Sequence, residues 1–358
     1  MWSCLAFLLL ILSSPQMNKE SCLEPPQGID LSGTRALSPE KICLLLNSLP
    51  TSGKEMKLGS VAVKGRALPL LCRFLERVQA ARAERVQEAP RLKSFTFAGG
   101  LIGPEEASQV LLLLLPSLET LCLKGNRLGP DGIGAVAEGV REGKASSLCV
   151  LDLEETGLEK EGTRILCSAI KGKSLKVETL NLSRNRIGQM EEMKQLCSVL
   201  CVNSLPSLCA LLLRRCGLTD MAVKPLTEAM GRGGLRSLEM LDLGAGYSFQ
   251  GGFFGDLGEA LRVDAVPRLR ELNLEGARTD WDPSASREAV NSFFGALRAT
   301  KCPPNLCVQG LRFFASDPIE WVTFGADKLG SSIRTLDLSL YREQVTRFLE
   351  GMKNGGEN

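Results

Sequence analysis

The chain contains no histidine among its 358 residues. This absence excludes a Ser-His-Asp triad, a Cys-His catalytic pair and every zinc site that needs an imidazole ligand. The chain also lacks a P-loop and a glycine-rich strand-to-helix fingerprint, which cradle nucleotide phosphates, so we expect no cofactor. It contains no apolar run of about 18 residues, the length needed to span a membrane as a helix.

Neither sign of charge dominates the composition. Lys and Arg total 43, Asp and Glu total 41, and the formal net charge is +2. This balance gives no overall attraction to nucleic acid or to an anionic membrane, so we expect no nucleic-acid partner and no integral membrane span. Hydrophobic residues make up 44% of the chain and charged residues 23%. Both values are near the globular average, and most of the chain should therefore fold.

Thirteen cysteines are present, but their spacing is not that of a small disulfide framework. Cys72, Cys167 and Cys197 lie on stretches with helical periodicity, where a free thiol packs as a small hydrophobe. We therefore predict reduced, structural thiols. Cys197 and Cys201 are four residues apart and could share one helix face, but without a second pair of ligands they do not define a metal site.

The N-terminal segment permits two interpretations. Residues 5–12 (LAFLLLIL) resemble the apolar region of a signal peptide, and removal of Cys4 would leave an even number of cysteines. Against this, residues 1–12 contain no Lys or Arg, and no small-x-small cleavage site follows. The alternative is an apolar helix that caps the first structural unit. We predict a cytoplasmic protein, with secretion as the alternative if residues 1 to about 15 are cleaved.

One spacing of leucines recurs along the chain. Residues 118–128 read L-x-x-L-x-L-x-x-N-x-L, and the frame returns at residues 148–158, 177–187 and 208–218. A repeat of this length predicts a solenoid, in which each unit buries its apolar face against its neighbours. Frames of varying strength begin at Pro26, Leu58, Leu92, Leu118, Leu148, Val177, Leu208, Leu238, Leu269, Val308 and Ile333.

Each unit combines two periods. The L-x-L core alternates like a half-buried strand, and helical spacing follows it, as in residues 161–170. Strands stack about 4.8 Å apart whereas helices need about 8–10 Å, so the stack should bend with parallel strands inside. We expect Asn at the ninth position to bond backbone groups within the turn, with Thr156 and Cys216 as partial replacements. Permissive glycines stand beside the turn at Gly157 and Gly217.

A full helix in a unit of about 30 residues resembles the ribonuclease-inhibitor class of leucine-rich repeat proteins. Residues 121–140 (LCLKGNRLGPDGIGAVAEGV) carry the resemblance most clearly, and residues 178–188 (ETLNLSRNRIG) add to it. It covers roughly residues 26–350. It implies an α/β leucine-rich repeat solenoid, a horseshoe with parallel strands on the concave face, helices on the convex face and about ten to eleven repeats.

We divide the chain into an N-terminal apolar segment (1–25), a leucine-rich repeat domain (26–340), and a C-terminal capping helix with a short disordered tail (341–358). The long step between the frames at Leu269 and Val308 predicts a loop extension. Residues 76–91 should form a charged helical extension with a solvated face.

Aromatic residues cluster in one unit. Tyr247, Phe249, Phe253 and Phe254 stand close together in a chain with only 5% aromatics. They could form a contact patch on one rim. We favour the alternative that Phe253 and Phe254 begin a helix and face the core.

Charged residues between the leucines are the candidate contact surface. On the inner sheet, these positions should face solvent. An acidic patch on one strand is followed by a basic patch on the next two, and patches of opposite sign orient a partner. The alternative is that these charges only keep the face soluble. The candidate residues are Lys124, Asp152, Glu154, Glu155, Arg184, Arg186, Arg214, Arg215, Asp242 and Asn273.

Three functions agree with these observations. We favour a non-catalytic interaction module or scaffold that binds a protein partner on the concave face. The first alternative is a small-GTPase regulator, because the chain resembles the Ran activator. That family, however, has a long acidic C-terminal tail, whereas the tail here is short and not strongly acidic. The second alternative is a secreted or surface recognition domain. The shared repeat motif does not choose between these roles.

Overall fold

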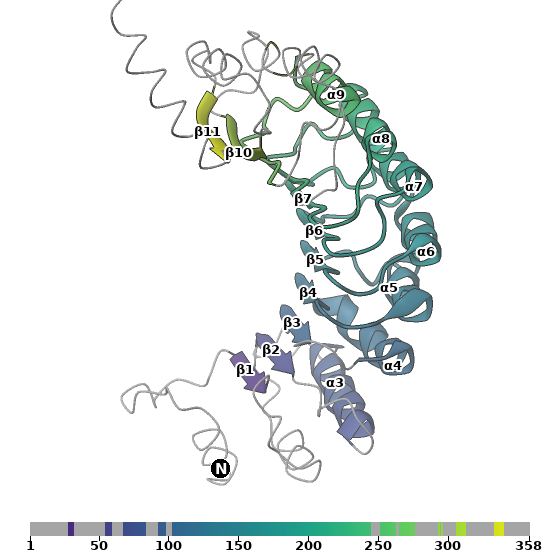
Figure 1. Ribbon diagram of the computed structural model, residues 1–358. Coiled ribbons are helices and arrows are strands. Elements are labelled where there is room, and N and C mark those ends of the chain that lie inside the picture. The colour runs from purple at the N-terminus through teal and green to yellow at the C-terminus, as the bar shows by residue number, and fades with distance from the viewer. Residues whose placement is uncertain are drawn as a thin grey trace, which may run out of the picture. The chain divides into compact units, whose positions relative to one another are not determined.

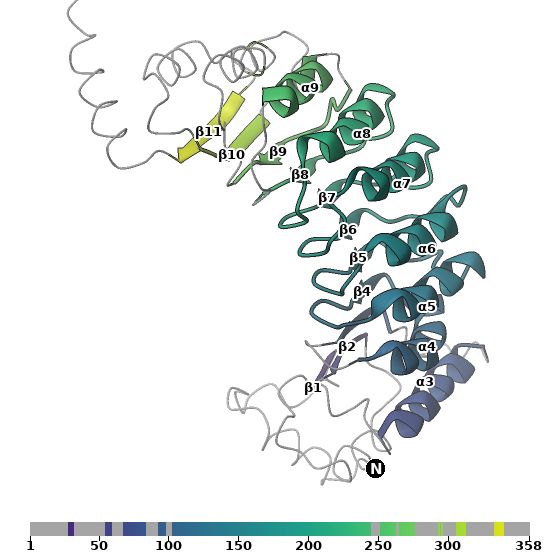
Figure 2. The same cartoon turned by 45° about the vertical axis from the view of Figure 1, so that its right-hand side comes forward.

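The computed structural model of the chain contains two units, in each of which strands alternate with helices (Figures 1 and 2). One unit comprises residues up to 170 with 175–177, and the other comprises 171–174 with the residues from 178 on. The described residues are 28–31, 54–58, 67–83, 92–97, 102–244, 251–262, 265–275, 293, 295, 306–312 and 333–339. The predicted terminal segments, Tyr247, Phe249, residues 84–91 and most of the predicted loop extension lie outside them.

The strands of the first unit pair in parallel and in chain order. Leu121 lies in register between Phe95 and Leu151, and all three side chains are buried. The helices pack side by side along the opposite side of the unit (Figure 2). The strands are β1 (Gly28–Leu31), β2 (Glu55–Leu58), β3 (Ser94–Phe97), β4 (Thr120–Cys122) and β5 (Val150–Asp152); the helices are α3 (Ala67–Ala83), α4 (Pro104–Leu114), α5 (Gly129–Arg141) and α6 (Lys160–Ile170).

The second unit repeats this arrangement. Leu211 lies in register between Leu180 and Leu241, again with all three side chains buried. The strands are β6 (Thr179–Asn181), β7 (Ala210–Leu212), β8 (Met240–Asp242), β9 (Glu271–Asn273), β10 (Leu306–Arg312) and β11 (Ile333–Ser339); the helices are α7 (Met190–Cys201), α8 (Asp220–Gly231) and α9 (Gly251–Arg262). Each unit therefore has the predicted α/β leucine-rich repeat architecture.

The core of a repeat forms between its strand and its helix. On α5, Ile133, Val136 and Val140 are spaced three and four residues apart and are fully buried, as are Leu121 and Leu123 of the same repeat. Helix α6 begins one residue before its predicted start and ends at the predicted residue. The switch from a period of two to a period of 3.6 therefore marks the change from strand to helix.

Two weak frames were placed wrongly. The frame at Leu58 predicts that Val61 and Val63 face inward, but β2 ends at Leu58, with Met56 and Leu58 buried. In the frame at Val308, Val308 itself pairs with Leu272, and β10 has register shifts against β11. The core positions of β2 fall five residues earlier than predicted, whereas β10 begins earlier than predicted, at Leu306, but still includes the predicted Leu311.

The ninth position satisfies the turn as predicted. The Asn126 side-chain amide donates to the Leu123 carbonyl at 2.8 Å, and the Asn185 amide donates to the Leu182 carbonyl at 2.9 Å. Thr156 Oγ1 donates to the carbonyl three residues before it, at 2.8 Å. Cys216 Sγ approaches the Leu182 carbonyl at 3.2 Å. These side chains are buried, so each bond replaces one that water would have made.

Backbone bonds to the following repeat extend beyond the strands. The N–H of Leu123 donates to Asp152 O and that of Gly125 to Glu154 O, both at 2.8 Å. In the second unit, the N–H of Arg215 donates to Gly244 O at 2.9 Å. Each of these turns is thus held by the backbone of the next repeat. Within the residues that the structure describes, no helix has the length and apolarity needed to cross a bilayer.

Candidate functional site

The fifth position of the frame ends four of the strands, β5, β6, β8 and β9, with an acceptor side chain. Asp152 Oδ1 accepts the backbone N–H of Glu154 at 2.9 Å, and Asp242 Oδ1 accepts that of Gly244 at 2.8 Å. Asn181 and Asn273 make the same bond to the residue two positions on, at 3.0 and 2.9 Å. These side chains form local turns with the backbone. Asp242 and Asn273, both candidate contact residues, therefore also have a structural role.

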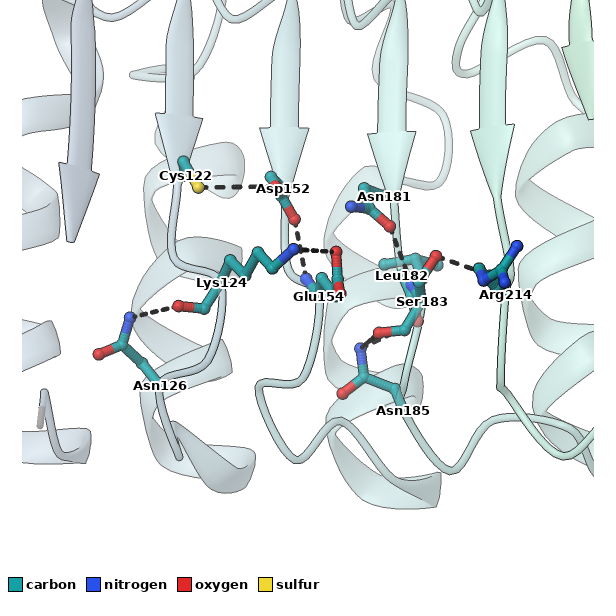
Figure 3. A network of polar contacts seen from close by, with 10 residues as sticks. All are labelled: Cys122, Lys124, Asn126, Asp152, Glu154, Asn181, Leu182, Ser183, Asn185 and Arg214. Carbon is teal, nitrogen blue, oxygen red and sulfur yellow. Dashed lines mark hydrogen bonds and ion pairs between the residues drawn. The ribbon is translucent and has the colours of Figure 1, made fainter. Parts of the chain in front are cut away.

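The first unit carries an ion pair across neighbouring strand ends. Lys124 Nζ lies 2.9 Å from Glu154 Oε2, and Cys122 Sγ donates to Asp152 Oδ2 at 3.5 Å (Figure 3). Lys124 is about half exposed, whereas Glu154 is largely covered. Three of the candidate residues are thus brought together, and their charges are partly neutralised within the chain.

The second unit carries an ion pair that passes over an intervening strand. Arg214 follows β7, and Glu275 follows β9. The Nη2 atom of Arg214 lies 2.5 Å from Oε2 of Glu275. Between them stands Gly244, after β8. A Cβ at that position would lie 3.2 Å from Arg214 Nη1 and 2.9 Å from Asp242 Oδ1. The missing side chain therefore leaves the space through which the guanidinium reaches Glu275.

Two positions of the predicted solvent-facing rows are buried. Asn181 is 8% exposed and Ser183 is 5% exposed. Ser183 Oγ accepts the backbone N–H of Arg214 at 3.2 Å (Figure 3). Ser183 stands between the leucine positions, where the alternation of the strand predicts a solvent-facing side chain. This prediction was wrong, because the Ser183 side chain bonds the backbone of the neighbouring repeat.

Four candidate residues lie on turns after the strands rather than on the strands themselves. Glu155, Arg184 and Arg215 occupy the eighth position with φ values of 56°, 58° and 56°, and Gly125 occupies it in the frame from Leu118 with φ 74°. Arg186 follows two residues after Arg184, and all four charged side chains are exposed. The expected basic patch is thus divided: Arg214 lies at the end of its strand, and the other three arginines lie on the rim.

Three of the thiols are poorly suited to nucleophilic chemistry. Burial raises the pKa of Cys167 and of Cys216 to about 12. Burial is also the main cause that raises the pKa of Cys122 to about 11, and Asp152 adds to it. A thiol with a raised pKa is protonated at neutral pH and inert. Within the described part of the chain, no disulfide joins two cysteines and no cluster of three metal-binding side chains occurs.

The aromatic contact patch is excluded for two of its members. Phe253 and Phe254 lie in the first turn of α9 and are each 1% exposed. Phe254 packs against Phe293 with ring centroids 5.7 Å apart. The favoured prediction that they begin a helix and face the core is confirmed.

The candidate list omitted Glu275, the ionic partner of Arg214. Its signal was present, because Glu275 occupies the seventh position of its frame, as Lys124 and Glu154 do in theirs. Pairing across an intervening strand was missed because it depends on the absence of a side chain at Gly244.

Comparisons with known proteins give structural matches only. No family model matches the chain, and no curated protein matches it. The leucine-rich repeat protein LegL7 from Legionella pneumophila matches with a TM-score of 0.47 and 16% identity, over 86% of this chain and 92% of LegL7. Rad7, in its complex with Elc1 in yeast, matches with a TM-score of 0.47 and 17% identity, over 90% and 75%.

A third match is TLR13 in its complex with ssRNA13. Its TM-score is 0.39 and its identity 16%, over 90% of this chain and 43% of TLR13. The strand, turn and helix that recur in the chain itself identify the fold.

Proposed function

We propose that the chain is a non-catalytic interaction module that binds a protein partner on the strand side of its repeats. The observation that supports this proposal is the fixed presentation of charged groups at the strand ends. Lys124 and Arg214 follow strands whose ends are bonded to the next repeat, so a partner would meet them with little ordering cost. The absence of histidine and the raised thiol pKa values agree with a function other than catalysis.

The ion pairs would position charged groups for a partner rather than stabilise the fold. Lys124–Glu154 and Arg214–Glu275 contain exposed groups, and such pairs contribute little to the free energy of unfolding. They do fix the positions of both charges before a partner arrives. Fixed charges of both signs favour one orientation of the partner over others and speed its association.

The test is affinity purification with three baits. The first is the wild-type chain, and the second is the strand-side variant Lys124→Gln, Arg214→Gln, Glu275→Gln. The third is a matched helix-side variant that removes two cations and one anion from α7 and α8, namely Lys194→Gln, Lys224→Gln and Glu228→Gln.

We expect a partner that the wild-type and helix-side baits capture equally and that the strand-side bait captures at least about fivefold less. The purified partner should then bind the wild-type chain directly. Failure of the wild-type bait to retain any protein above bare resin would refute the interaction module. Loss of the partner from the helix-side bait alone would show that the partner contacts the helices, and would refute the proposed strand-side contact.

A further inference from the structure

The turns after β6 and β7 present three arginines on one rim of the second unit. The N–H of Arg184 donates to Arg214 O at 2.7 Å, which makes the two turns direct neighbours. Arg184 and Arg215 occupy the same position in consecutive repeats, and Arg186 lies two residues beyond the first. All three side chains are exposed. We call Arg184, Arg186 and Arg215 the arginine rim.

The backbone holds two members of the rim in an unfavourable conformation. Arg184 and Arg215 have φ values of 58° and 56°, where a side chain costs about 1 kcal/mol relative to glycine. Glycine fills the same position at Gly125, so the turn itself does not require arginine. Glu155 holds the same position with a φ of 56°, so the turn accepts either charge and the sequence alone sets the positive sign of this rim.

The arginine rim lies beyond the ends of the strands. Arg184, Arg186 and Arg215 project from turns beyond the last paired residues of β6 and β7. Because the turns are bonded to the next repeat, the spacing of the rim is set by the strand spacing, about 4.8 Å.

We infer that the arginine rim binds a short acidic segment of a protein partner, with its carboxylates on the guanidinium groups. This inference rests on the proposed function and deepens it, since it names the chemistry of the partner. Arginine recognises a carboxylate through two parallel N–H···O bonds. Carboxylates at adjacent or alternate positions of an extended segment repeat every 3.3 to about 6.6 Å, a spacing that flexible arginines in neighbouring repeats can follow.

One observation favours an acidic peptide over nucleic acid. Acidic side chains stand at the end of β8 and after β9, at Asp242 and Glu275, and these would repel a long polyanion that continued past the rim. A short acidic segment that contacts only the rim avoids this repulsion.

The test measures binding of a fluorescein-labelled oligoglutamate to the full chain by fluorescence anisotropy. The rim variant is Arg184→Gln, Arg186→Gln, Arg215→Gln. The matched control is Lys194→Gln, Lys224→Gln, Arg232→Gln, which removes three exposed cations from α7 and the end of α8. Glutamine keeps the backbone preference of arginine, and circular dichroism melts would verify that both variants fold.

We expect the rim variant to bind about tenfold more weakly at low salt, and the control to bind like the wild-type chain. Higher salt should weaken the wild-type binding. No binding by the wild-type chain, or equal weakening in both variants, would overturn the inference. So would tighter binding of a single-stranded oligonucleotide of equal charge, since the rim would then be a nucleic-acid site.

The same variants separate this inference from the proposed function. If the partner captured by the wild-type bait is lost from the strand-side variant but retained by the rim variant, the rim inference fails and the interaction module stands. If oligoglutamate binds the rim but no protein is captured, the interaction module fails alone. Loss of the captured partner from the rim variant would support both.

Discussion

The frames that begin at Leu118 and Leu208 build the same turn from different residues. The eighth and ninth positions are Gly125 and Asn126 in the first, and Arg215 and Cys216 in the second. Both turns bond to the following repeat through the same backbone N–H, at 2.8 and 2.9 Å. The backbone hydrogen bonds between neighbouring repeats, rather than the side chains, therefore define the turn. The side chains determine how stable each turn is and what it presents to solvent.

The largest difference should arise at the ninth position. Asn126 donates to carbonyls of its own turn and accepts the N–H of Ile102 at 3.3 Å, whereas Cys216 offers only sulfur contacts. Asn126→Ala would leave several buried groups without partners, so we expect a loss of about 3 kcal/mol in the free energy of unfolding. Cys216→Ala should cost about 1 kcal/mol. Urea denaturation followed by circular dichroism would measure both, and equal losses would contradict the comparison.

Alkaline pH should lower the free energy of unfolding through the Cys216 thiol, whereas the Asn126 amide does not titrate. The pKa of Cys216 is raised by burial to about 12 from 9.0. The folded chain therefore keeps a proton that the unfolded chain releases, and stability is lost as the pH rises above about 9. Near pH 10 this loss should be about 1 kcal/mol. The Cys216→Ala variant should fall less steeply over the same range, and identical slopes would argue against a buried thiol.

Exchanging glycine and arginine at the eighth position should change the free energy of unfolding in opposite directions in the two frames. Arg215→Gly relieves a left-handed backbone conformation and should raise the free energy of unfolding by about 1 kcal/mol. Gly125→Arg imposes that conformation on a side chain and should lower it by a similar amount. Thermal melts of the two variants provide the measurement. A loss of stability in Arg215→Gly would mean that the arginine side chain stabilises its own turn.

The smallest effect should come from the ion pairs. Arg214 and Glu275 are 30% and 45% exposed, so Arg214→Gln should cost at most about 0.5 kcal/mol. A double-mutant cycle with Glu275→Gln should give a coupling that fades with added salt. A coupling well above 1 kcal/mol would show that the pair over Gly244 stabilises the fold and would weaken its assignment as a prearranged contact.

Much of the fold could be predicted from the leucine spacing. The frames from Leu118 to Leu269 place β4 to β9 at the observed residues, because a fully buried L-x-L core leaves one possible register. The frames at Leu58 and Val308 failed because their apolar residues permit several registers. The ninth-position bonds were also predictable, since a buried side chain inside a turn must satisfy backbone groups.

The candidate site was less accessible to sequence reasoning. Charges could be assigned to positions in a frame, but their pairing depends on neighbouring side chains. Ser183 is buried because it accepts a backbone N–H from the next strand, and Glu275 pairs with Arg214 because Gly244 leaves room. Neither contact follows a local period. The division of the arginines between strand end and rim likewise required the φ values of Arg184 and Arg215.

The backbone hydrogen bonds between neighbouring repeats also affect the order in which the repeats fold during translation. The N–H of Leu123 finds its acceptor at Asp152, and that of Leu213 finds its acceptor at Asp242, in each case in the repeat that follows. The backbone N–H groups of a newly synthesised turn therefore find their acceptors only after the next repeat has left the ribosome. The chain should gain structure one repeat behind translation, with the newest turn always the most open to proteases and chaperones.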